Sequence, residues 1–373
     1  MIKILSIVGA RPQFIKAAVL SRLIRSRYRT DFVEYLVHTG QHYDANMSEI
    51  FFQEMMIPKP DRNLNVGSGT HGKQTGEMLI RIEEVILEQK PDIVLVYGDT
   101  NSTLAGALAA SKLHIPVAHV EAGLRSFNME MPEEQNRVLT DHISTFLFCP
   151  TEVAKKNLIK EGIDKGVEIV GDIMFDASLF YREFVKTKSF EVGKKLEDNF
   201  YLLTLHRAEN TDDYTRLHSI VDALNSLVEY KGVFPIHPRT KKALERFGLG
   251  FGSHIKVIEP VGFLEMLWLE EKASFIVTDS GGVQKEAYFF NKPCITLRDQ
   301  TEWVETVKSG WNVLVGASGE KIKRAFKEVA ELQSSRSKEI IVVSKPKNHP
   351  AFYGNGDAGI RILEYIKDKL LSN

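Results

Sequence analysis

The stretch that decides the fold is FIVTDSGGVQKEA, residues 275–287. Its first four residues are apolar or β-branched, which predicts a buried strand. The strand pattern stops at Asp279, and a helical pattern begins after Gly282. Glycines at this position can make a tight strand-to-helix turn and nothing more. They can also expose the first N–H groups of the helix, whose N-terminus attracts anions such as phosphate. Both interpretations predict a strand followed directly by a helix, which is the unit of a parallel sheet.

The length and composition of the chain are those of a globular protein with two domains. The chain has 373 residues, of which 43% are hydrophobic and 26% charged, so it exceeds one ordinary domain and has material for a large core. Its formal net charge of −1 provides no basic excess that would favour nucleic acid or an anionic membrane. We therefore expect neither of these as a partner.

Cysteine usage and the apolar runs indicate where the protein works. The two cysteines, Cys149 and Cys294, each end an apolar run, which is typical of packed thiols. No disulfide framework or metal-ligand spacing is found, and we expect neither a metal nor another cofactor. The apolar run 4–8 is too short for a signal peptide, and no apolar stretch approaches the ~18 residues that span a bilayer. These features predict a cytoplasmic protein.

Short apolar runs alternate with longer helical patterns along the whole chain. Runs that are apolar on both faces and separated by helices predict a parallel sheet covered on both sides. The predicted strands of a first series are 2–8, 32–38, 93–97, 117–120, 146–149 and 167–170, and those of a second are 200–205, 233–236, 255–257, 275–278, 294–297 and 312–315. Helices are expected between them, for example from about Phe14 to Arg27 and over 76–89. The polar stretch 186–199 breaks the rhythm and is predicted to be a boundary helix or a linker.

This pattern predicts an α/β fold with two Rossmann-like, doubly wound domains that face each other across a cleft. Residues 1–170 form the predicted first domain and residues 171–357 the second, and a final helix is expected within 358–373. Ligands of such domains bind at the carboxyl ends of the strands.

Polar side chains gather at those strand ends. They are Arg11 and Lys16 after the first strand, Asp99, Glu121 and Glu133 after later ones, and His206 and Ser280 in the second domain. Glu121 directly follows a buried strand, where a carboxylate needs a partner or a task. Because all of these residues fall on one predicted rim, we interpret them together as a site.

Each of these residues also has an ordinary structural explanation. Asp99 precedes a helical pattern and can be a helix cap. Glu133 or Glu134 can be a first-turn acid of a helix, and Arg11 and Lys16 can be surface charges. His206 can be a hydrogen-bonded histidine of the core. His237 ends a strand as well but lacks a neighbouring acid, which favours a structural role.

Combined in one cleft, these groups suit a nucleotide-diphosphate sugar. The helix after Ser280, Gly281 and Gly282 would hold the diphosphate, and Glu286, one turn later, would accept hydrogen bonds from ribose. Glu286 can equally be a surface residue of that helix. The acids favour proton transfer at a sugar carbon, because removing and returning a proton requires positioned acid and base groups.

Taken together, the motifs resemble those of the non-hydrolysing UDP-N-acetylglucosamine 2-epimerases, and the resemblance runs over nearly the whole chain. The matching segments are Gly9-Ala10-Arg11-Pro12 with Lys16, Gly98-Asp99-Thr100, His119 to Arg125, Pro132-Glu133-Glu134 with Asn136-Arg137, His206-Arg207, and Asp279 to Gly282 with Glu286. The family has the two-domain GT-B fold, with the last helix packed back on the first domain. We also expect a homodimer.

The resemblance implies a mechanism and a role for each residue. UDP is eliminated to leave a 2-acetamidoglucal and is added back after C2 has been reprotonated on the other face. Asp99, Glu121 and Glu133 match the family's proton-transfer residues, and His206 matches the residue at the leaving diphosphate. Arg11 and Lys16 match further active-site residues, and Ser280, Gly281, Gly282 and Glu286 match the UDP-binding residues.

Some positions depart from the family pattern. Trp303 stands where many relatives have an arginine near the nucleotide sugar, and Met266 stands where an aromatic residue often lies near uracil. The segments GARPQFIK and TEWVE resemble the subgroup that acts on UDP-2,3-diacetamido-2,3-dideoxy-D-glucuronate. Gln41, Arg207 and His237 match a second, activating UDP-N-acetylglucosamine site, but Asp44 replaces an amide there.

Two other functions compete with this hypothesis. A GT-B glycosyltransferase would need an acceptor groove and leaves three clustered acids unexplained. A UDP-sugar sensor without catalytic activity would keep the Ser-Gly-Gly loop but has no use for Glu121 and His206.

Overall fold

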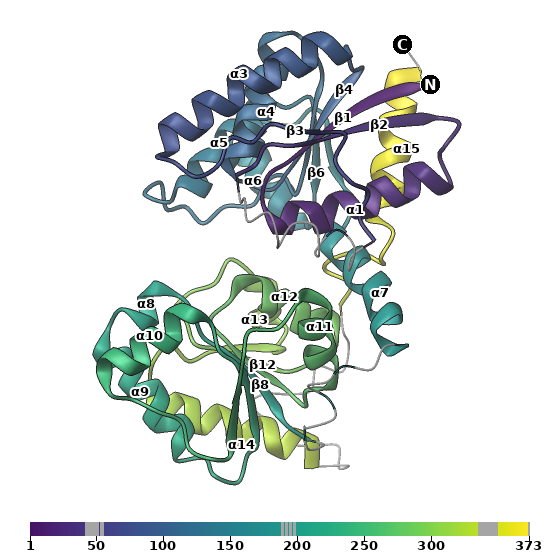
Figure 1. The fold of residues 1–373 in the computed structure, drawn as a ribbon. Helices are drawn as coiled ribbons and strands as arrows, with labels where there is room; N and C mark the ends of the chain where they lie inside the picture. Colours follow the sequence, from purple (N-terminus) through teal and green to yellow (C-terminus); the bar gives the residue numbers. More distant parts are fainter. Residues whose placement is uncertain are drawn as a thin grey trace. The chain divides into compact units, whose positions relative to one another are not determined.

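The computed structural model describes residues 1–41, 52, 56–187, 190, 193, 196, 199–334 and 350–371 (Figure 1). The chain divides into two compact units. The first contains Met1–Leu179 and Ala351–Asn373, and the second contains Phe180–Pro350. Most of the predicted linker 186–199 lies outside the described residues. No helix of the described ranges is long and apolar enough to cross a membrane.

The first unit is built on a parallel sheet of seven strands in the order β3-β2-β1-β4-β5-β6-β7. The strands are β1 (Ile2–Val8), β2 (Phe32–His38), β3 (Arg62–Asn63), β4 (Ile93–Tyr97), β5 (Val117–Val120), β6 (Phe146–Cys149) and β7 (Val167–Ile169). The sequence did not predict β3, because two polar residues carry no strand pattern. The strand order reverses between β1 and β4, and the carboxyl ends beside that point carry the candidate residues of this unit.

Helices connect these strands. They are α1 (Arg11–Ser26), α3 (His71–Gln89), α4 (Asn101–Lys112), α5 (Pro132–Ile143) and α6 (Glu152–Lys160). After β7 come α7 (Ile173–Lys186), whose residues from Phe180 belong to the second unit, and, at the end of the chain, the final helix α15 (Ala358–Leu371). The first helix begins three residues before the predicted Phe14. The side chain of Gln13 explains the difference, because its Oε1 accepts the N–H groups of Gly9 at 2.8 Å and of Ala10 at 3.0 Å. Pro12 then supplies a helical φ in the first turn.

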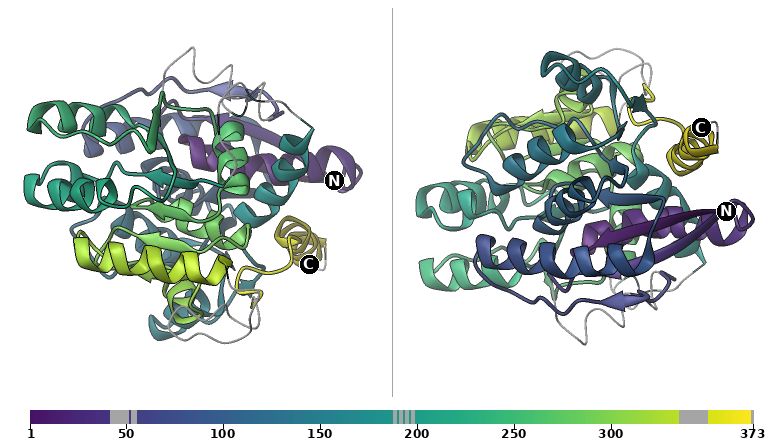
Figure 2. Two further views of the ribbon diagram at one scale, coloured as in Figure 1. Left: turned by 90° about the horizontal axis from the view of Figure 1, so that it is seen from below. Right: turned by 90° about the horizontal axis from the view of Figure 1, so that it is seen from above.

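The second unit contains a parallel sheet of six strands in the order β10-β9-β8-β11-β12-β13. The strands are β8 (Tyr201–Thr204), β9 (Gly232–Pro235), β10 (Ile255–Ile258), β11 (Ile276–Thr278), β12 (Cys294–Thr296) and β13 (Asn312–Leu314). The helices are α8 (Ala208–Thr211), α9 (Tyr214–Asn225), α10 (Pro238–Phe247), α11 (Phe263–Lys272), α12 (Gly281–Phe289), α13 (Val304–Lys308) and α14 (Gly319–Ser334). In Figure 2, α14 runs along this sheet, and it contacts β12 and α9.

The central strands of each sheet are buried on both faces, which explains why they are apolar throughout. All residues of β4, β5 and β6 are buried in the first unit, as are those of β8 and β11 in the second. Two hydrophobic clusters cover the second sheet, one including Leu203 and Val277 and the other Leu202 and Ile276. Alternate residues of each strand thus enter different clusters, as the geometry of a strand requires.

The final helix α15 packs on α1 within the first unit (Figure 1). Tyr28 donates a hydrogen bond to Glu364 at 3.0 Å, and Lys367 pairs with Asp31 at 2.7 Å. The N-terminus of α15 is held by Asp176, whose carboxylate accepts the N–H groups of Ala358 at 3.2 Å and Gly359 at 2.9 Å. A chain end is thereby tied to α7, which begins 185 residues earlier.

Asp176 should make the stability of the protein depend on pH. Burial raises the pKa of Asp176 to about 6, although the two backbone hydrogen bonds lower it. The unfolded value is ~3.9, so between about pH 4 and pH 6 the folded state keeps a proton that the unfolded state has lost. The contribution of Asp176 to the free energy of unfolding therefore falls as pH rises through this window.

We expect the stability of the wild type relative to Asp176→Asn to fall by roughly 2 kcal/mol between pH 4.5 and pH 7. Urea unfolding at a series of pH values, followed by circular dichroism, measures this difference. Parallel stability curves for the two proteins would contradict the assignment.

Candidate active site

Three segments of the first unit meet at the carboxyl ends of β4 and β5. Lys16 of α1 forms an ion pair with Glu121, which follows β5, and their side chains are only 9% and 10% exposed. A Cβ placed on Gly98, which follows β4, would lie 3.3 Å from Lys16 Nζ and 3.4 Å from Glu121 Oε2. The structure thus brings together Lys16 and Glu121, which the sequence predicted to share a site.

The backbone of Glu121 has an unusual conformation. Its φ is +74°, in the left-handed region that a glutamate seldom adopts. The N–H groups of Glu121 and Ala122 both donate to the carbonyl of Phe148 at 3.1 Å. Such a conformation persists only where surrounding contacts impose it, and it is typical of functional sites.

A buried histidine fixes the neighbouring backbone. Nε2 of His119 bonds the carbonyl of Gly98 at 2.7 Å, and Nδ1 bonds Asp141 Oδ1 at 2.7 Å. Both ring nitrogens face acceptor oxygens, so the ring is held from both sides. Burial alone would raise the pKa of Asp141, but the hydrogen bonds and charges of His119 and Arg125 lower it below its ordinary range. This group anchors the peptide that leads into Asp99.

Asp99 lies at the end of this anchored peptide and is not a helix cap. The N-cap of α4 is Thr100, whose Oγ1 accepts the N–H of Thr103 at 3.4 Å. The Asp99 carboxylate instead pairs with Arg137 of α5, and its side chain is 31% exposed. Asn136 donates to the Asp99 carbonyl at 3.0 Å. The capping explanation for Asp99 is therefore wrong, and its partly exposed carboxylate follows Gly98, the glycine beside the Lys16–Glu121 pair.

The two glutamates at the start of α5 have different environments. Glu134 is buried and accepts hydrogen bonds from the N–H groups of Ser126 at 2.9 Å and Phe127 at 2.8 Å. It also pairs with Arg137 at 2.9 Å. Glu133, in the same turn, is exposed. Glu134 thus holds a loop, and Glu133 is the one with a side chain accessible to a ligand.

Arg11 occupies the first position of α1 and is exposed. Lys16 follows about one and a half turns later on the same helix. The helix starts directly after β1, so its first turn lies at the carboxyl edge of the sheet. Both cations are therefore carried by the edge that also carries Asp99 and Glu121.

In the second unit, Asp279 joins two strand ends. Its fully buried carboxylate accepts the N–H groups of His206 at 3.0 Å and Arg207 at 2.9 Å, and Nδ2 of Asn210 at 3.2 Å. These donors follow β8, and Asp279 itself follows β11. The sequence does not reveal this role of Asp279, and the only signal in it is a carboxylate directly after a buried strand.

The imidazole of His206 lies beside this carboxylate. Its Nδ1 is 3.5 Å from Asp279 Oδ1, and its ring centre is 5.6 Å from that of His237. Burial lowers the pKa of His206, and the charge of Asp279 opposes the shift while His237 adds to it. His206 is thus a partly exposed histidine at a strand end and not a residue of the core. His237 caps α10, where its Nδ1 accepts the N–H of Arg239 at 3.1 Å.

The N-terminus of α12 is formed by the Ser-Gly-Gly stretch. Ser280 is the N-cap, but its side chain makes no capping hydrogen bond. A Cβ on Gly281 would collide with the carboxylate of Glu302 and lie 3.7 Å from Arg207 Nη2. Glu302 is paired with Arg298 at 3.0 Å. A carboxylate at a helix N-terminus, next to two guanidinium groups, marks this position as favourable for an anion.

The remaining predicted positions lie near α12 or outside the described ranges. Glu286 is partly exposed on α12. Trp303 is buried and packs under Lys285, whose Nζ is 4.3 Å from the ring centre. Met266 packs against a hydrophobic cluster of the second unit. Gln41 accepts a hydrogen bond from Ser102 Oγ at 2.7 Å, whereas Asp44 lies outside the described residues.

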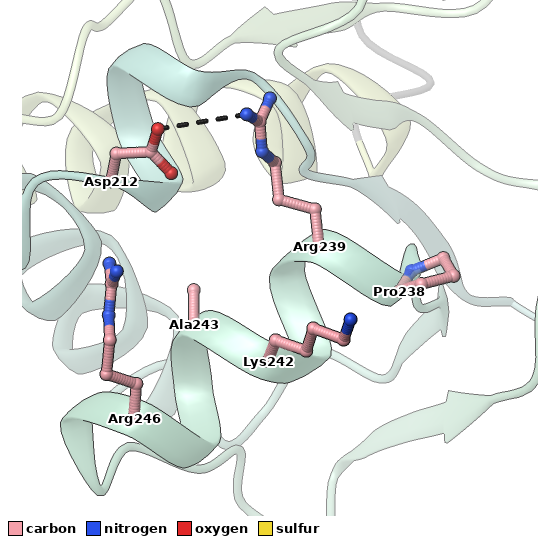
Figure 3. Close-up of a pocket in the computed structure, with 6 residues that line it drawn as sticks. All are labelled: Asp212, Pro238, Arg239, Lys242, Ala243 and Arg246. Carbon is pink, nitrogen blue, oxygen red and sulfur yellow. Dashed lines mark ion pairs between the residues drawn. The ribbon is translucent and has the colours of Figure 1, made fainter.

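A cavity of about 390 Å³ lies in the second unit, beside α10 (Figure 3). Three cations of α10 line it together with an acid at the end of α8, and the lining residues are Asp212, Pro238, Arg239, Lys242, Ala243 and Arg246. Arg239 and Asp212 approach to 3.8 Å. None of the predicted site residues lines this cavity.

Comparison with known proteins gives a consistent family. A family model described as UDP-N-acetylglucosamine 2-epimerase matches residues 25–367. A UDP-2,3-diacetamido-2,3-dideoxy-D-glucuronate 2-epimerase of Pseudomonas aeruginosa is 55% identical over 369 residues, covering 98% of this chain and 99% of the relative. A UDP-N-acetylglucosamine 2-epimerase of Methanocaldococcus jannaschii is 49% identical over 380 residues, covering 98% of this chain and all of the relative.

Solved structures are similar over the whole chain. The crystal structure of the Methanocaldococcus jannaschii UDP-GlcNAc 2-epimerase in complex with UDP-GlcNAc and UDP has a TM-score of 0.83 at 47% identity, covering 98% of this chain and 99% of that one. The Neisseria meningitidis enzyme bound to UDP-GlcNAc has a TM-score of 0.86 at 31% identity, with full coverage of both chains. A glycosyltransferase of Rickettsia africae, at 13% identity and a TM-score of 0.60, is similar in fold alone.

The two doubly wound sheets are thus those of a GT-B-type α/β protein, which confirms the predicted fold class. The chain belongs to the UDP-N-acetylglucosamine 2-epimerase family, and the resemblance inferred from its motifs is confirmed. The cleft between the two domains stays a prediction.

The different environments of Glu133 and Glu134 can be tested by a matched pair of alanine variants. Glu134→Ala removes a buried carboxylate with several charge-assisted hydrogen bonds, so we expect a loss of about 2–3 kcal/mol in the free energy of unfolding. Glu133→Ala should stay within about 0.5 kcal/mol of wild type, because its side chain is exposed. Urea unfolding measures both, and equal losses in the two variants would contradict the structural assignment.

Proposed function

We propose that the protein is a non-hydrolysing 2-epimerase that interconverts UDP-N-acetylglucosamine and UDP-N-acetylmannosamine. The observation that carries this proposal is the cluster at the ends of β4 and β5, where Glu121 is paired with Lys16 and Asp99 is the next residue after Gly98. Membership of the family and the similarity to enzymes solved with UDP-GlcNAc support it. A glycosyltransferase or a sensor would have no use for these acids.

In the proposed reaction, a carboxylate removes the C2 proton while the bond between C1 and the diphosphate oxygen breaks. The electron pair of the C2–H bond forms the C1–C2 double bond of a 2-acetamidoglucal, and the C1–O pair leaves on UDP. A second acid then delivers a proton to the opposite face of C2, and a diphosphate oxygen of UDP adds to C1. We propose that Asp99, Glu121 and Glu133 share the proton transfers and that Arg11 and Lys16 hold negative charge of the substrate.

The second unit provides the proposed nucleotide site. The N–H groups of the first turn of α12, at Ser280, Gly281 and Gly282, would bind the diphosphate, and Glu286 would accept hydrogen bonds from ribose. His206 would stabilise the leaving diphosphate as a hydrogen-bond donor. The lowered pKa of His206, caused mainly by burial, favours the neutral ring before a ligand binds. An approaching diphosphate would favour the protonated ring.

UDP-2,3-diacetamido-2,3-dideoxy-D-glucuronate is a second candidate substrate. The Pseudomonas aeruginosa relative with that name is 55% identical to this chain. Trp303 stands where the resemblance implies an arginine in many relatives; it is buried, and Lys285 Nζ lies 4.3 Å from its ring centre. Incubation with each sugar nucleotide separately decides between the two substrates.

We further propose that the protein works in the cytoplasm as a homodimer without a metal or other cofactor. Both cysteines, Cys149 and Cys294, are free and buried, as expected in a reducing compartment. The site chemistry proposed above requires only acids, bases and donors from the chain. Light scattering coupled to gel filtration measures the oligomeric state.

Incubation with UDP-N-acetylglucosamine in D₂O tests the proposed reaction. We expect deuterium at C2 of both epimers without an acceptor or added cofactor, because the elimination passes the C2 proton to a group that exchanges with solvent. Proton NMR follows the loss of the C2 signal. Turnover only in the presence of an acceptor glycan would favour a transferase instead.

Two variants connect this exchange to the site. Asp99→Asn and Glu121→Gln should each slow epimerisation by about 10²-fold or more, the scale of positioned acid–base catalysis. Their affinity for UDP should change little, because the proposed nucleotide contacts lie in the second unit. A variant with nearly normal turnover would remove that residue from the mechanism.

Gly282→Val tests the anion site at α12. A Cβ on Gly282 meets only Ser280 Oγ, at 4.0 Å, so a valine finds space within the protein. We nevertheless expect at least a tenfold loss of UDP affinity, because the side chain would stand where the diphosphate approaches. Isothermal titration calorimetry measures the affinity.

Gly76→Val is the matched control, since Gly76 also lies in a helix and a Cβ there has nothing within 4 Å. It should bind UDP like wild type. If a folded Gly282→Val protein binds UDP with wild-type affinity, the two glycines form a turn and do not contribute to an anion site.

A further inference from the structure

A buried carboxyl group lies against the proposed nucleotide-binding helix. Glu270 of α11 is fully buried, and neither of its side-chain oxygens accepts a hydrogen bond from an N–H or O–H group in the described part of the chain. An ionised carboxylate in such a place would cost several kcal/mol. Glu270 is therefore best accommodated as the neutral acid, which can donate a hydrogen bond.

The surroundings of Glu270 are apolar. Its neighbour Leu269 belongs to one hydrophobic cluster with Val283 and Ala287 of α12 and with Cys294 of β12. Helices α11 and α12 therefore contribute to the same hydrophobic cluster, and they lie side by side in Figure 1. Glu270 follows Leu269 on α11 and Glu286 precedes Ala287 on α12, so both acids adjoin this cluster in sequence.

The charged group that acts on Glu270 is the carboxyl group of Glu286. Two neighbouring carboxyl groups repel each other unless one of them carries a proton. Burial raises the pKa of Glu270 well above its ordinary range, and the charge of Glu286 raises it further. Glu286 is partly exposed, so the proton belongs on the fully buried Glu270 and the negative charge on Glu286.

We propose that Glu270 is a positioning residue that donates a hydrogen bond to Glu286 and orients its carboxylate for the ribose hydroxyls of the nucleotide. One carboxylate oxygen of Glu286 is held by Glu270, and the other is directed to the ligand. This inference rests on the proposed function, in which Glu286 binds ribose. It adds a buried acid to the nucleotide site that no motif of the sequence marked.

Two substitutions separate positioning from packing. Glu270→Met keeps the volume of the side chain but removes the donor, whereas Glu270→Gln keeps a neutral donor in its amide group. We expect Glu270→Met to weaken UDP binding about tenfold, the scale of one charge-assisted hydrogen bond. Glu270→Gln should remain within about threefold of wild type. Leu269→Met, a change in the same helix and the same cluster, is the control for altered packing.

The contribution of the ribose hydroxyls to UDP affinity distinguishes positioning from a purely structural role. A structural role of Glu270 would leave this contribution unchanged. Each protein is titrated calorimetrically with UDP and with 2′,3′-dideoxy-UDP, which lacks both hydroxyls. We expect the loss in Glu270→Met for UDP only, since the dideoxy compound gains nothing from Glu286. Equal losses for both nucleotides, or wild-type UDP affinity in folded Glu270→Met, would overturn the inference.

Infrared spectroscopy of the wild type provides a measurement that does not depend on the folding of Glu270→Met. A protonated-carboxyl band should change when UDP binds and should be missing from Glu270→Gln. A difference spectrum without such a band would overturn the inference. Wild-type protein that fails to bind UDP at all would instead contradict the proposed function, so the two failures are distinguishable.

Discussion

Asp279 stands fully buried at the end of β11, and its carboxylate accepts hydrogen bonds from three groups that follow β8. Two of them are the backbone N–H groups of His206 and Arg207. Without these donors the buried charge would be strongly destabilising, so the loop after β8 has little freedom. Replacing Asp279 would release the segment that carries His206, and for this reason the proposed chemistry of the second unit depends on it.

The first unit also contains a buried aspartate whose hydrogen bonds fix a strand end, but its partners are different groups. There the buried acid is Asp141, which sits in α5 and is bonded by His119 and Arg125. The other nitrogen of His119 bonds the carbonyl of Gly98, which follows β4. The imidazole ring of His119 therefore links the carboxylate of Asp141 in α5 to the end of β4. In both units, therefore, a buried aspartate positions the residues that are proposed to contact the substrate. The aspartate itself is not one of those residues. Such an arrangement is rigid, which acid–base catalysis requires, because a displacement of about 1 Å is costly to rate.

The sequence predicted the sheets well because their strands are apolar on both faces, and this pattern is local. Twelve of the thirteen strands correspond to apolar runs, and the missing one, β3, consists of Arg62 and Asn63 only. Helix starts were less accurate where a side chain makes the cap, as Gln13 does for α1.

The partners of the site residues were not predictable in this way. Asp279 and His206 are 73 residues apart in sequence, and Lys16 and Glu121 are 105 apart. No periodicity relates such positions, although the type of residue and its place after a strand did identify Glu121 and His206 as candidates. The contrast between Glu133 and Glu134 also lies beyond a sequence pattern, since it depends on which side chain faces the loop at Ser126.

The N-terminus of α12 shows how a site for an anion can be stable before the anion binds. Glu302 places its carboxylate over Gly281, and Arg298 and Arg207 are close to the same position. The positive end of the helix is thereby partly neutralised by the protein itself. Under the proposed function, a diphosphate that binds there would displace Glu302 and break its ion pair with Arg298. The same guanidinium group can pair with the diphosphate, which carries two negative charges where a carboxylate carries one and which also accepts bidentate hydrogen bonds. This exchange would replace one anion by another without exposing an unpaired cation. The net affinity would then reflect the difference between the two anions, which would favour release of the UDP-sugar after each turnover.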